Sequence, residues 1–435
     1  MARNMKDSGI EWIGEIPEGW EITKIKHIVS SVTDIDHFMP DSAEFGIPYL
    51  MIGDLKDLSS SIDWDSSKKI SIEDYKKLSI KSRPQIGDII FARYASIGTT
   101  CYIDTDRDFL VSYACLTIHP SDLIIGKFLS YYLKSSSFAE DVLRRTNSNT
   151  QGNVGKDSLV NATIVLPSII EQTQIVNFLD AKCSDINAML SKIRASIEEY
   201  KKLKQAVITQ AVTKGVRGKR EMKDSGVEWI GEIPKEWVIQ KIKSISSRIN
   251  VGVVIRPSEY FDENGTVPFL RGINVKEYLI SSDNMVYINE SSNHILSKSQ
   301  VHTDDILIVR DGSIGTSCVV PAEYDGANVV SMVIVTPSTS CDSRFICYSL
   351  NSDVGKTQFT LTKIGSALTH TSVSAVSDII VAVPSCAEQK EIADYLDAKC
   401  AEIDGLIAKK EQLVKELESY KKSLIYEVVT GKREV

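Results

Sequence analysis

The chain has 435 residues, 43% of them hydrophobic and 25% charged, with a formal net charge of −8 at pH 7. This composition is typical of a globular protein, and the length predicts at least two hydrophobic cores. No run of about 18 apolar residues is present to span a bilayer, and the first residues lack the apolar segment of a secretory signal, so we expect a cytoplasmic protein without membrane contact. An acidic chain is an unusual nucleic-acid binder, because the phosphate backbone attracts basic surfaces.

The chain begins with a segment that it later repeats. Residues 5–20 read MKDSGIEWIGEIPEGW and residues 222–237 read MKDSGVEWIGEIPKEW, a displacement of 217 positions (222 − 5). The same displacement relates LDAKC at 179–183 to LDAKC at 396–400. Solenoid repeats have periods of only about 20–50 residues, so this period marks two tandem domains. We predict a first domain over 1–166, a long helix over 167–216, a second domain over 217–383 and a second long helix over 384–435.

Each copy continues with a region that is rich in predicted strands. The matching strands IPYLM at 47–51 and VPFL at 267–270 are offset by 220, because the second copy carries three additional residues upstream. Residues 87–103 and 304–320 each predict a buried strand, a polar turn and a second strand. Between these segments the copies differ almost everywhere, which indicates one duplicated frame that carries two diverged surfaces.

Each copy ends in a long amphipathic helix. Apolar residues recur at steps of three, four or seven over 171–212 and over 388–429. A helix of this length with a single apolar stripe needs a partner, so we expect the two helices to pair antiparallel as a coiled coil, with the domains at opposite ends. Lys204 and Lys410 also fall on the stripe, where they either extend toward solvent or set the register. The predicted seam consists of Ile186, Ile193, Ile197, Tyr200, Val207, Ile403, Ile407, Val414, Leu417 and Leu424.

Motifs for metal binding and catalysis are missing from the sequence. Its eight cysteines and six histidines show no zinc-binding spacing, so reduced structural thiols are expected. Gly355-Lys356-Thr357 resembles the end of a phosphate-binding loop, but Leu350 stands where that loop requires glycine. We therefore expect no catalytic residue, metal or cofactor in this chain.

The end of the predicted buried strand provides a first candidate DNA-binding site. A guanidinium group followed by small hydroxyl donors on a glycine-containing turn suits contact with phosphate or with guanine. Alternatively, the arginine anchors a structural turn through backbone carbonyls, because a residue kept in both copies serves their shared frame. The residues of this site are Arg93, Ser96 and Thr99 in the first copy and Arg310, Ser313 and Thr316 in the second.

A second candidate site is the polar segment near the end of each domain, at 144–158 and 361–374. The two segments differ in sequence but keep a polar composition, as expected of loops that read different bases. An ordinary solvated loop is the alternative. Arg271 is a further candidate that the first copy lacks, since Met51 takes its place, whereas the basic stretch at 214–220 is typical of a linker. The candidates on the polar segments are Arg144, Asn149, Gln151, Lys363 and His370.

Together these motifs resemble the specificity subunit of Type I restriction–modification systems over the whole chain. The markers are the two opening motifs, the GDIIFAR and SIGT elements at 87–99 with their copy at 304–316, and the helix starts LPSIIEQTQIVNFLDAKC and VPSCAEQKEIADYLDAKC. The resemblance implies an α+β fold: two α/β target recognition domains related by an internal pseudo-two-fold repeat and joined by two long antiparallel coiled-coil helices.

The resemblance also implies partners. Each domain would read one half of a split double-stranded DNA target, and the helices would set the spacing and dock two methyltransferase subunits, with restriction subunits joining the complex. S-adenosylmethionine and the modification of a flipped adenine would belong to the methyltransferase subunits. The alternative is a coiled-coil adaptor that does not bind nucleic acid, which the acidic charge favours. The base sequence that is read does not follow from the residues alone.

Overall fold

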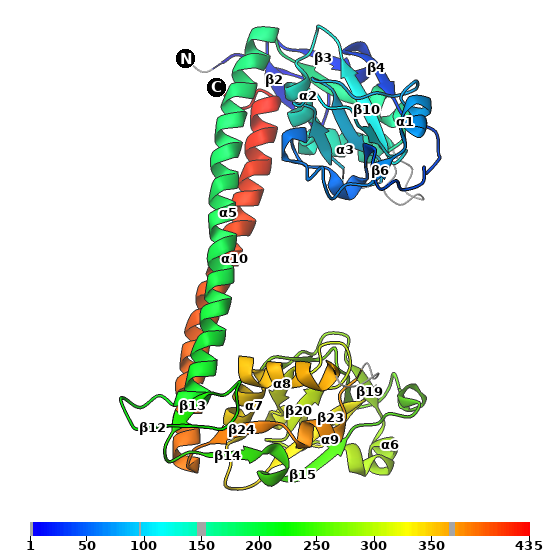
Figure 1. Ribbon diagram of the computed structural model, residues 1–435. Coiled ribbons are helices and arrows are strands. Elements are labelled where there is room, and N and C mark those ends of the chain that lie inside the picture. Colours follow the sequence, from blue (N-terminus) through cyan, green and yellow to red (C-terminus); the bar gives the residue numbers. More distant parts are fainter. Residues whose placement is uncertain (1–2, 95–96, 146–153, 365–369) are drawn as a thin grey trace. The chain divides into compact units, whose positions relative to one another are not determined.

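The computed structural model describes residues 3–94, 97–145, 154–364 and 370–435, and these form two compact units (Figure 1). Unit 1 contains Met1–Arg194 and Gln412–Val435, and unit 2 contains Ala195–Glu411. All eight cysteines are free thiols. In the described part of the chain, no helix combines the length and apolar character that crossing a bilayer requires.

Unit 1 is built around a four-stranded antiparallel sheet in the order β4-β10-β7-β8. A smaller sheet in the order β6-β5-β9 contains a parallel pair, and two-stranded ladders join β1 to β2 and β3 to β11. The strands are β1 (Met5–Asp7), β2 (Glu15–Pro17), β3 (Glu21–Lys24), β4 (Val29–Thr33), β5 (Ile47–Leu50), β6 (Lys69–Ile70), β7 (Ile89–Ala92), β8 (Thr100–Tyr102), β9 (Leu110–Val111), β10 (Cys115–Pro120) and β11 (Thr163–Leu166). The helices of this part of the chain are α1 (Ile72–Leu78), α2 (Gly126–Leu133), α3 (Ser136–Arg145), α4 (Lys156–Asn161) and the long α5 (Ile169–Lys214).

Unit 2 repeats this plan, with a four-stranded sheet in the corresponding order β15-β23-β20-β21. Its smaller sheet, in the order β19-β16-β22, again contains a parallel pair. The strands are β12 (Met222–Asp224), β13 (Glu232–Pro234), β14 (Val238–Lys241), β15 (Ser246–Val251), β16 (Val267–Leu270), β17 (Val275–Lys276), β18 (Leu279–Ile280), β19 (Val286–Ile288), β20 (Ile306–Val309), β21 (Ser317–Val319), β22 (Asn328–Val329), β23 (Met332–Pro337) and β24 (Ile380–Val383). The helices are α6 (Glu290–Ile295), α7 (Ser343–Asn351), α8 (Asp353–Ile364), α9 (Val373–Ser377) and the long α10 (Cys386–Val429). The predicted matching strands and strand–turn–strand segments are therefore confirmed as β5 and β16, β7 and β8, and β20 and β21.

The repeated opening motif packs into the core of its unit. In unit 1 it forms the hairpin β1-β2, and Trp20 is 1% exposed in a core that includes Val428 and Val429 from the end of α10. In unit 2 the equivalent Trp237 is fully buried, in a core that includes Val212 from the end of α5. The motif therefore attaches the sheet domain of unit 1 to the end of α10 and the sheet domain of unit 2 to the end of α5. Each of these helices begins in the other unit.

A repeated glutamine explains why the helix starts are alike in the two copies. Gln172 is fully buried, and its side-chain amide donates to the Pro167 carbonyl at 2.9 Å and accepts from the Ile125 N–H at 2.8 Å. Gln389 makes the equivalent bonds to the Pro384 carbonyl and the Asp342 N–H. Since a buried amide that loses its partners is costly, this residue fixes the loop before α2 or α7 onto the long helix.

The long helices pair antiparallel within each unit. In unit 1 Lys421 of α10 donates to Asn187 of α5 at 2.9 Å, and in unit 2 Lys204 of α5 forms an ion pair of 2.7 Å with Asp404 of α10. Also in unit 2, the Lys410 ammonium lies 5.5 Å from the ring centroid of Tyr200. The ion pair of Lys204 favours the register role over simple extension into solvent. Of the predicted seam residues, Ile186, Ile197, Ile403 and Leu424 are buried, and the other six are half-buried.

Candidate nucleic-acid interface

The two candidate segments of each copy meet at the end of a central strand. Arg93 directly follows β7, and its carbonyl accepts from the Val154 N–H at 2.9 Å. Arg310 directly follows β20, and its carbonyl accepts from the Thr371 N–H at 3.1 Å. Val154 and Thr371 are one repeat apart (371 − 154 = 217) and lie in the two polar segments. The structure therefore joins the arginine turn to the divergent segment in the same way in both units.

The two arginine side chains have different partners. The Nε of Arg310 donates to the Thr371 carbonyl at 2.9 Å, which is the structural role considered above. The Arg93 side chain is 13% exposed, and its guanidinium group lies 3.3 Å from a carboxylate oxygen of Asp34. In the second copy Val251 stands in place of Asp34 (251 − 217 = 34). Its Nε is buried without a hydrogen-bond partner among the described residues. Both guanidinium groups are thus held by the frame, and contact with DNA remains a prediction for each.

Glycine holds the turn after each arginine against a helix of the same unit. Gly98 has a φ of +91°, and a Cβ there would lie 3.0 Å from the Leu133 carbonyl oxygen at the end of α2. Gly315 has a φ of +88°, and a Cβ there would lie 2.4 Å from the Phe359 ring of α8. Only glycine adopts such φ values without strain. The close backbone approach that we expected this turn to make to DNA is made instead to a helix of the same unit.

The hydroxyl candidates lie on or beside this turn. Thr99 and Thr316 are half-buried, and their carbonyls accept from Ala92 and Val309 at 3.0 and 2.9 Å, which closes the hairpin. Ser313 is exposed. Ser96 lies outside the described residues.

The remaining candidates are dispersed. Arg144 lies in the last turn of α3. Its guanidinium carbon lies 4.7 Å from the Trp12 ring centroid and its Nε 2.9 Å from Glu140, so it contacts the opening motif. Arg271 donates to the Asn284 carbonyl. His370 is half-buried and adjoins the Thr371 that Arg310 contacts. Asn149 and Gln151 lie outside the described residues, as does the side chain of Lys363.

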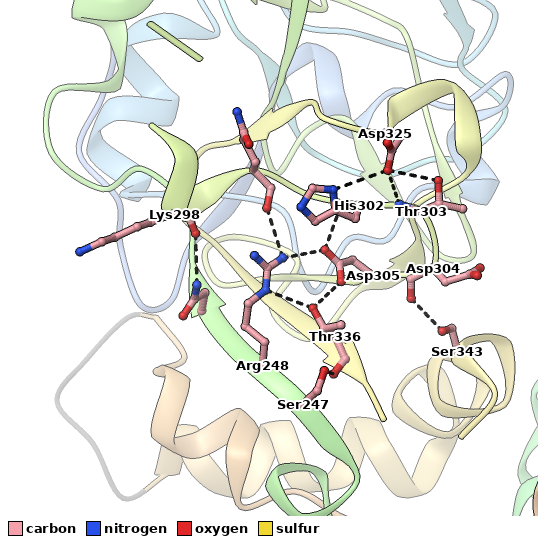
Figure 2. Close-up of polar contacts among 12 residues, drawn as sticks. Ser247, Arg248, Lys298, His302, Thr303, Asp304, Asp305, Asp325, Thr336 and Ser343 are labelled. Carbon is pink, nitrogen blue, oxygen red and sulfur yellow. Dashed lines mark hydrogen bonds and ion pairs between the residues drawn. The ribbon is translucent and has the colours of Figure 1, made fainter. Parts of the chain in front are cut away.

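A charged cluster in unit 2 has a structural role. Figure 2 shows Arg248 of β15 donating to Asp305 at 2.8 Å and to the Thr336 hydroxyl of β23 at 3.1 Å. Asp305 is 1% exposed and also accepts from the His302 N–H at 2.9 Å. In unit 1 the equivalent Asp88 pairs instead with a histidine, His119, at 2.9 Å. The copies therefore keep the buried carboxylate and change its partner, which secures the same sheet in two ways.

A family model described as the Type I restriction modification DNA specificity domain matches residues 17–199 and 234–416. The matched segments are displaced by the repeat length (234 − 17 = 217) and together cover more than half of the chain. The chain belongs to this family. Each unit thus contains most of one specificity domain, and the family match extends into α5 and α10.

The chain is also similar to curated relatives and to solved structures over nearly its whole length. The chain is 27% identical to the putative type I restriction enzyme MjaX specificity subunit of Methanocaldococcus jannaschii, over 97% of this chain and 95% of that one. It is 24% identical to the MjaVIII specificity subunit of the same organism, over 96% and 93% of the two chains. A chain from a solved structure on complex assembly and conformational transition of the type I R-M system superimposes with a TM-score of 0.71 at 15% identity, covering 96% of this chain and 99% of the other. The HsdS subunit of Thermoanaerobacter tengcongensis gives 0.51 at 16% identity, covering 96% and 98%. At these identities the two structures show the fold.

The specificity domains also present residues at the arginine turn that the sequence reasoning missed. Tyr94 follows Arg93, is 44% exposed and has the Arg93 guanidinium 5.8 Å from its ring centroid. Its equivalent after Arg310 is Asp311, an exposed carboxylate 3.2 Å from the Ser331 hydroxyl. Comparing the two copies position by position after each arginine would have revealed this pair, because an aromatic ring and a carboxylate present different chemistry from the same frame.

Proposed function

We propose that this chain is the DNA-reading and assembly subunit of a Type I restriction–modification complex. Each specificity domain reads one half of a bipartite double-stranded target, and α5 and α10 set the spacing and dock two methyltransferase subunits. Restriction subunits join the same complex. The methyltransferase subunits hold S-adenosylmethionine and modify adenine, and the restriction subunits carry the endonuclease, so this chain is not itself catalytic.

One observation supports bipartite reading above the others. The two units share a strand order and an arginine turn, yet the residue directly after the arginine is Tyr94 in one and Asp311 in the other. A tyrosine offers a base its ring and a hydroxyl that can donate, whereas a carboxylate only accepts hydrogen bonds, so the two side chains make different contacts. Two such readers on one chain suit two different half-sites.

Exchange of the domains tests this proposal. Residues 17–166 or 234–383 are replaced by the corresponding domain of an unrelated member of the family, and the complex with the methyltransferase subunits is assayed for adenine methylation across a genome. We expect each exchange to alter one half of the methylated motif and leave the other half unchanged. An unchanged motif after both exchanges, in a complex that still assembles, would refute DNA reading by these domains and favour the adaptor that does not bind nucleic acid.

The spacing role has its own test. Four residues are inserted in both long helices, between Arg194 and Ala195 and between Glu411 and Gln412, where the chain passes from one unit to the other. At about 1.5 Å per residue the helices lengthen by about 6 Å, which corresponds to roughly two base pairs at about 3.4 Å each. We expect the unspecified spacer of the methylated motif to change while both half-sites stay the same. An unchanged spacer in an active complex would contradict the role of the helices.

A further inference from the structure

A pocket in unit 1 lies beside the long helices, and neither Arg93 nor the residues of its turn line it. Its volume is about 340 Å³, within the range of about 300–1,000 Å³ that ligand pockets occupy. α2, the segment after β5 and the paired parts of α5 and α10 form its walls. Leu58 lines it together with Tyr131 of α2.

The charged residues of this pocket leave an excess of positive charge. Lys127 pairs with Asp180 at 2.7 Å, and Lys134 pairs with Asp57 at 2.7 Å. Lys421 is 3.8 Å from Asp57, which already has Lys134 as its closer partner. Three ammonium groups therefore face two carboxylates, so an occupant with one negative charge would balance the lining.

Unit 2 has the same polar frame at the equivalent place. The hydroxyl of Tyr131 donates to Asp180 at 2.8 Å, and in unit 2 the hydroxyl of Tyr348 donates to Asp397 at 2.8 Å. Each pair is one repeat apart from the other (348 − 131 = 217; 397 − 180 = 217). Lys421 of α10 likewise corresponds to Lys204 of α5 (421 − 204 = 217).

In unit 2 the chain itself fills this place with a tyrosine. The ring of Tyr278 lies 4.8 Å from the ring of Tyr348, and the Lys204 ammonium lies 5.6 Å from the Tyr278 ring centroid. The preceding Glu277 forms an ion pair of 2.8 Å with Lys356. With the offset of 220 that relates β5 to β16, Tyr278 corresponds to Leu58 (278 − 220 = 58). Unit 1 thus keeps the tyrosine and the lysine that hold the ring but has a shorter side chain in place of the ring.

We propose that the pocket of unit 1 receives a tyrosine side chain from a partner protein, presented next to an acidic residue. The ring lies against Tyr131 and beneath the Lys421 ammonium, as Tyr278 lies against Tyr348 and beneath Lys204 in unit 2. The acidic neighbour balances the excess positive charge of the lining. This inference rests on the pocket and its copy, so it stands whether or not the arginine turns read DNA. It makes unit 1 the half of the molecule that accepts this partner.

The test uses the full chain and a peptide that copies the natural occupant. The probe is acetyl-Glu-Tyr-Leu-amide, the sequence of residues 277–279, and its ring protons are followed by saturation-transfer NMR. The control peptide has leucine in place of tyrosine, and 4-hydroxyphenylacetate serves as a free aromatic acid. The variant Leu58→Tyr supplies the missing ring from within unit 1. Leu123→Tyr, at a leucine that is 56% exposed in the same unit, adds a ring outside the pocket.

We expect saturation transfer from the chain to the tyrosine peptide, a reduction of at least tenfold with Leu58→Tyr, and no change with Leu123→Tyr. The leucine peptide should show no specific signal. Absence of transfer to the tyrosine peptide, or transfer that Leu58→Tyr leaves intact, would overturn the proposal. Transfer to 4-hydroxyphenylacetate but not to the peptide would overturn the partner-protein assignment in favour of a small aromatic acid. Each outcome is independent of the methylated motif, so this test and the domain exchange can fail separately.

Discussion

Replacement of Arg310 by alanine separates the structural role of this residue from a role in DNA binding. The side chain donates a charged hydrogen bond to the carbonyl of Thr371, which is 4% exposed. Hydrogen bonds that involve a charged group contribute about 1.5–3 kcal/mol. Since 1 kcal/mol shifts the melting temperature of a unit of this size by about 2–4 °C, we expect a fall of about 3–12 °C by calorimetry.

The DNA-binding part of the same experiment is read from the salt dependence. If Arg310 contacts a phosphate, the slope of log K against log salt becomes shallower by about 0.9 in the complex with the methyltransferase subunits. If it reads guanine, the variant loses about 1–3 kcal/mol of discrimination at one base pair. Lys235→Ala, at an exposed cation of the opening motif, is the control. An unchanged melting temperature would refute the anchoring role, and an unchanged slope together with unchanged base preference in a folded variant would refute DNA contact.

Three further predictions concern the frame. Burial opposes the charge on Glu171, but hydrogen bonds, the largest from Trp20, lower the pKa of this carboxyl below its usual value. The ionised carboxylate therefore stabilises the fold above the usual pKa, and this stability is lost as the pH falls below that pKa. Glu171→Gln should accordingly flatten the decline of melting temperature from about pH 5 to 3. Burial raises the pKa of Cys101 and of Cys318 to about 12, so both thiols should react with Ellman's reagent at pH 8 only upon unfolding, and rapid reaction in the native chain would contradict their burial. Gln389→Ala leaves buried backbone groups unpaired at about 1–3 kcal/mol each, and a melting temperature within 1 °C of the parent would show that the amide does not fix the loop.

Sequence reasoning succeeded where the pattern is local or repeated. The hairpin of β7 and β8 follows from an apolar run, a glycine turn and a second run, and the long helices follow from an apolar stripe over 171–212 and 388–429. Their observed bounds, Ile169–Lys214 and Cys386–Val429, begin two residues earlier. At α5 a serine–glutamate capping pair, Ser168 and Glu171, stabilises the first turn.

Contacts between distant residues were beyond the same reasoning. The parallel pair of β5 and β9 joins segments about 60 residues apart, and no local period marks it. The partner of Arg93 is Asp34, which lies 59 positions away and has no counterpart in the second copy. The difference between Leu58 and Tyr278 is visible in the sequence, but its consequence is a pocket that only the folded lining defines.

The division of the chain between the two units fixes the order in which their cores can be completed during synthesis. Unit 2 is one continuous stretch, Ala195–Glu411, whereas the core of unit 1 includes Leu424, Val428 and Val429 from the last helix. A ribosome adds about 5–20 residues per second, so the domain that emerges first waits at least about ten seconds for its final apolar residues. The domain made first is the domain completed last, and its unfinished core is exposed to chaperones and proteases for most of that time.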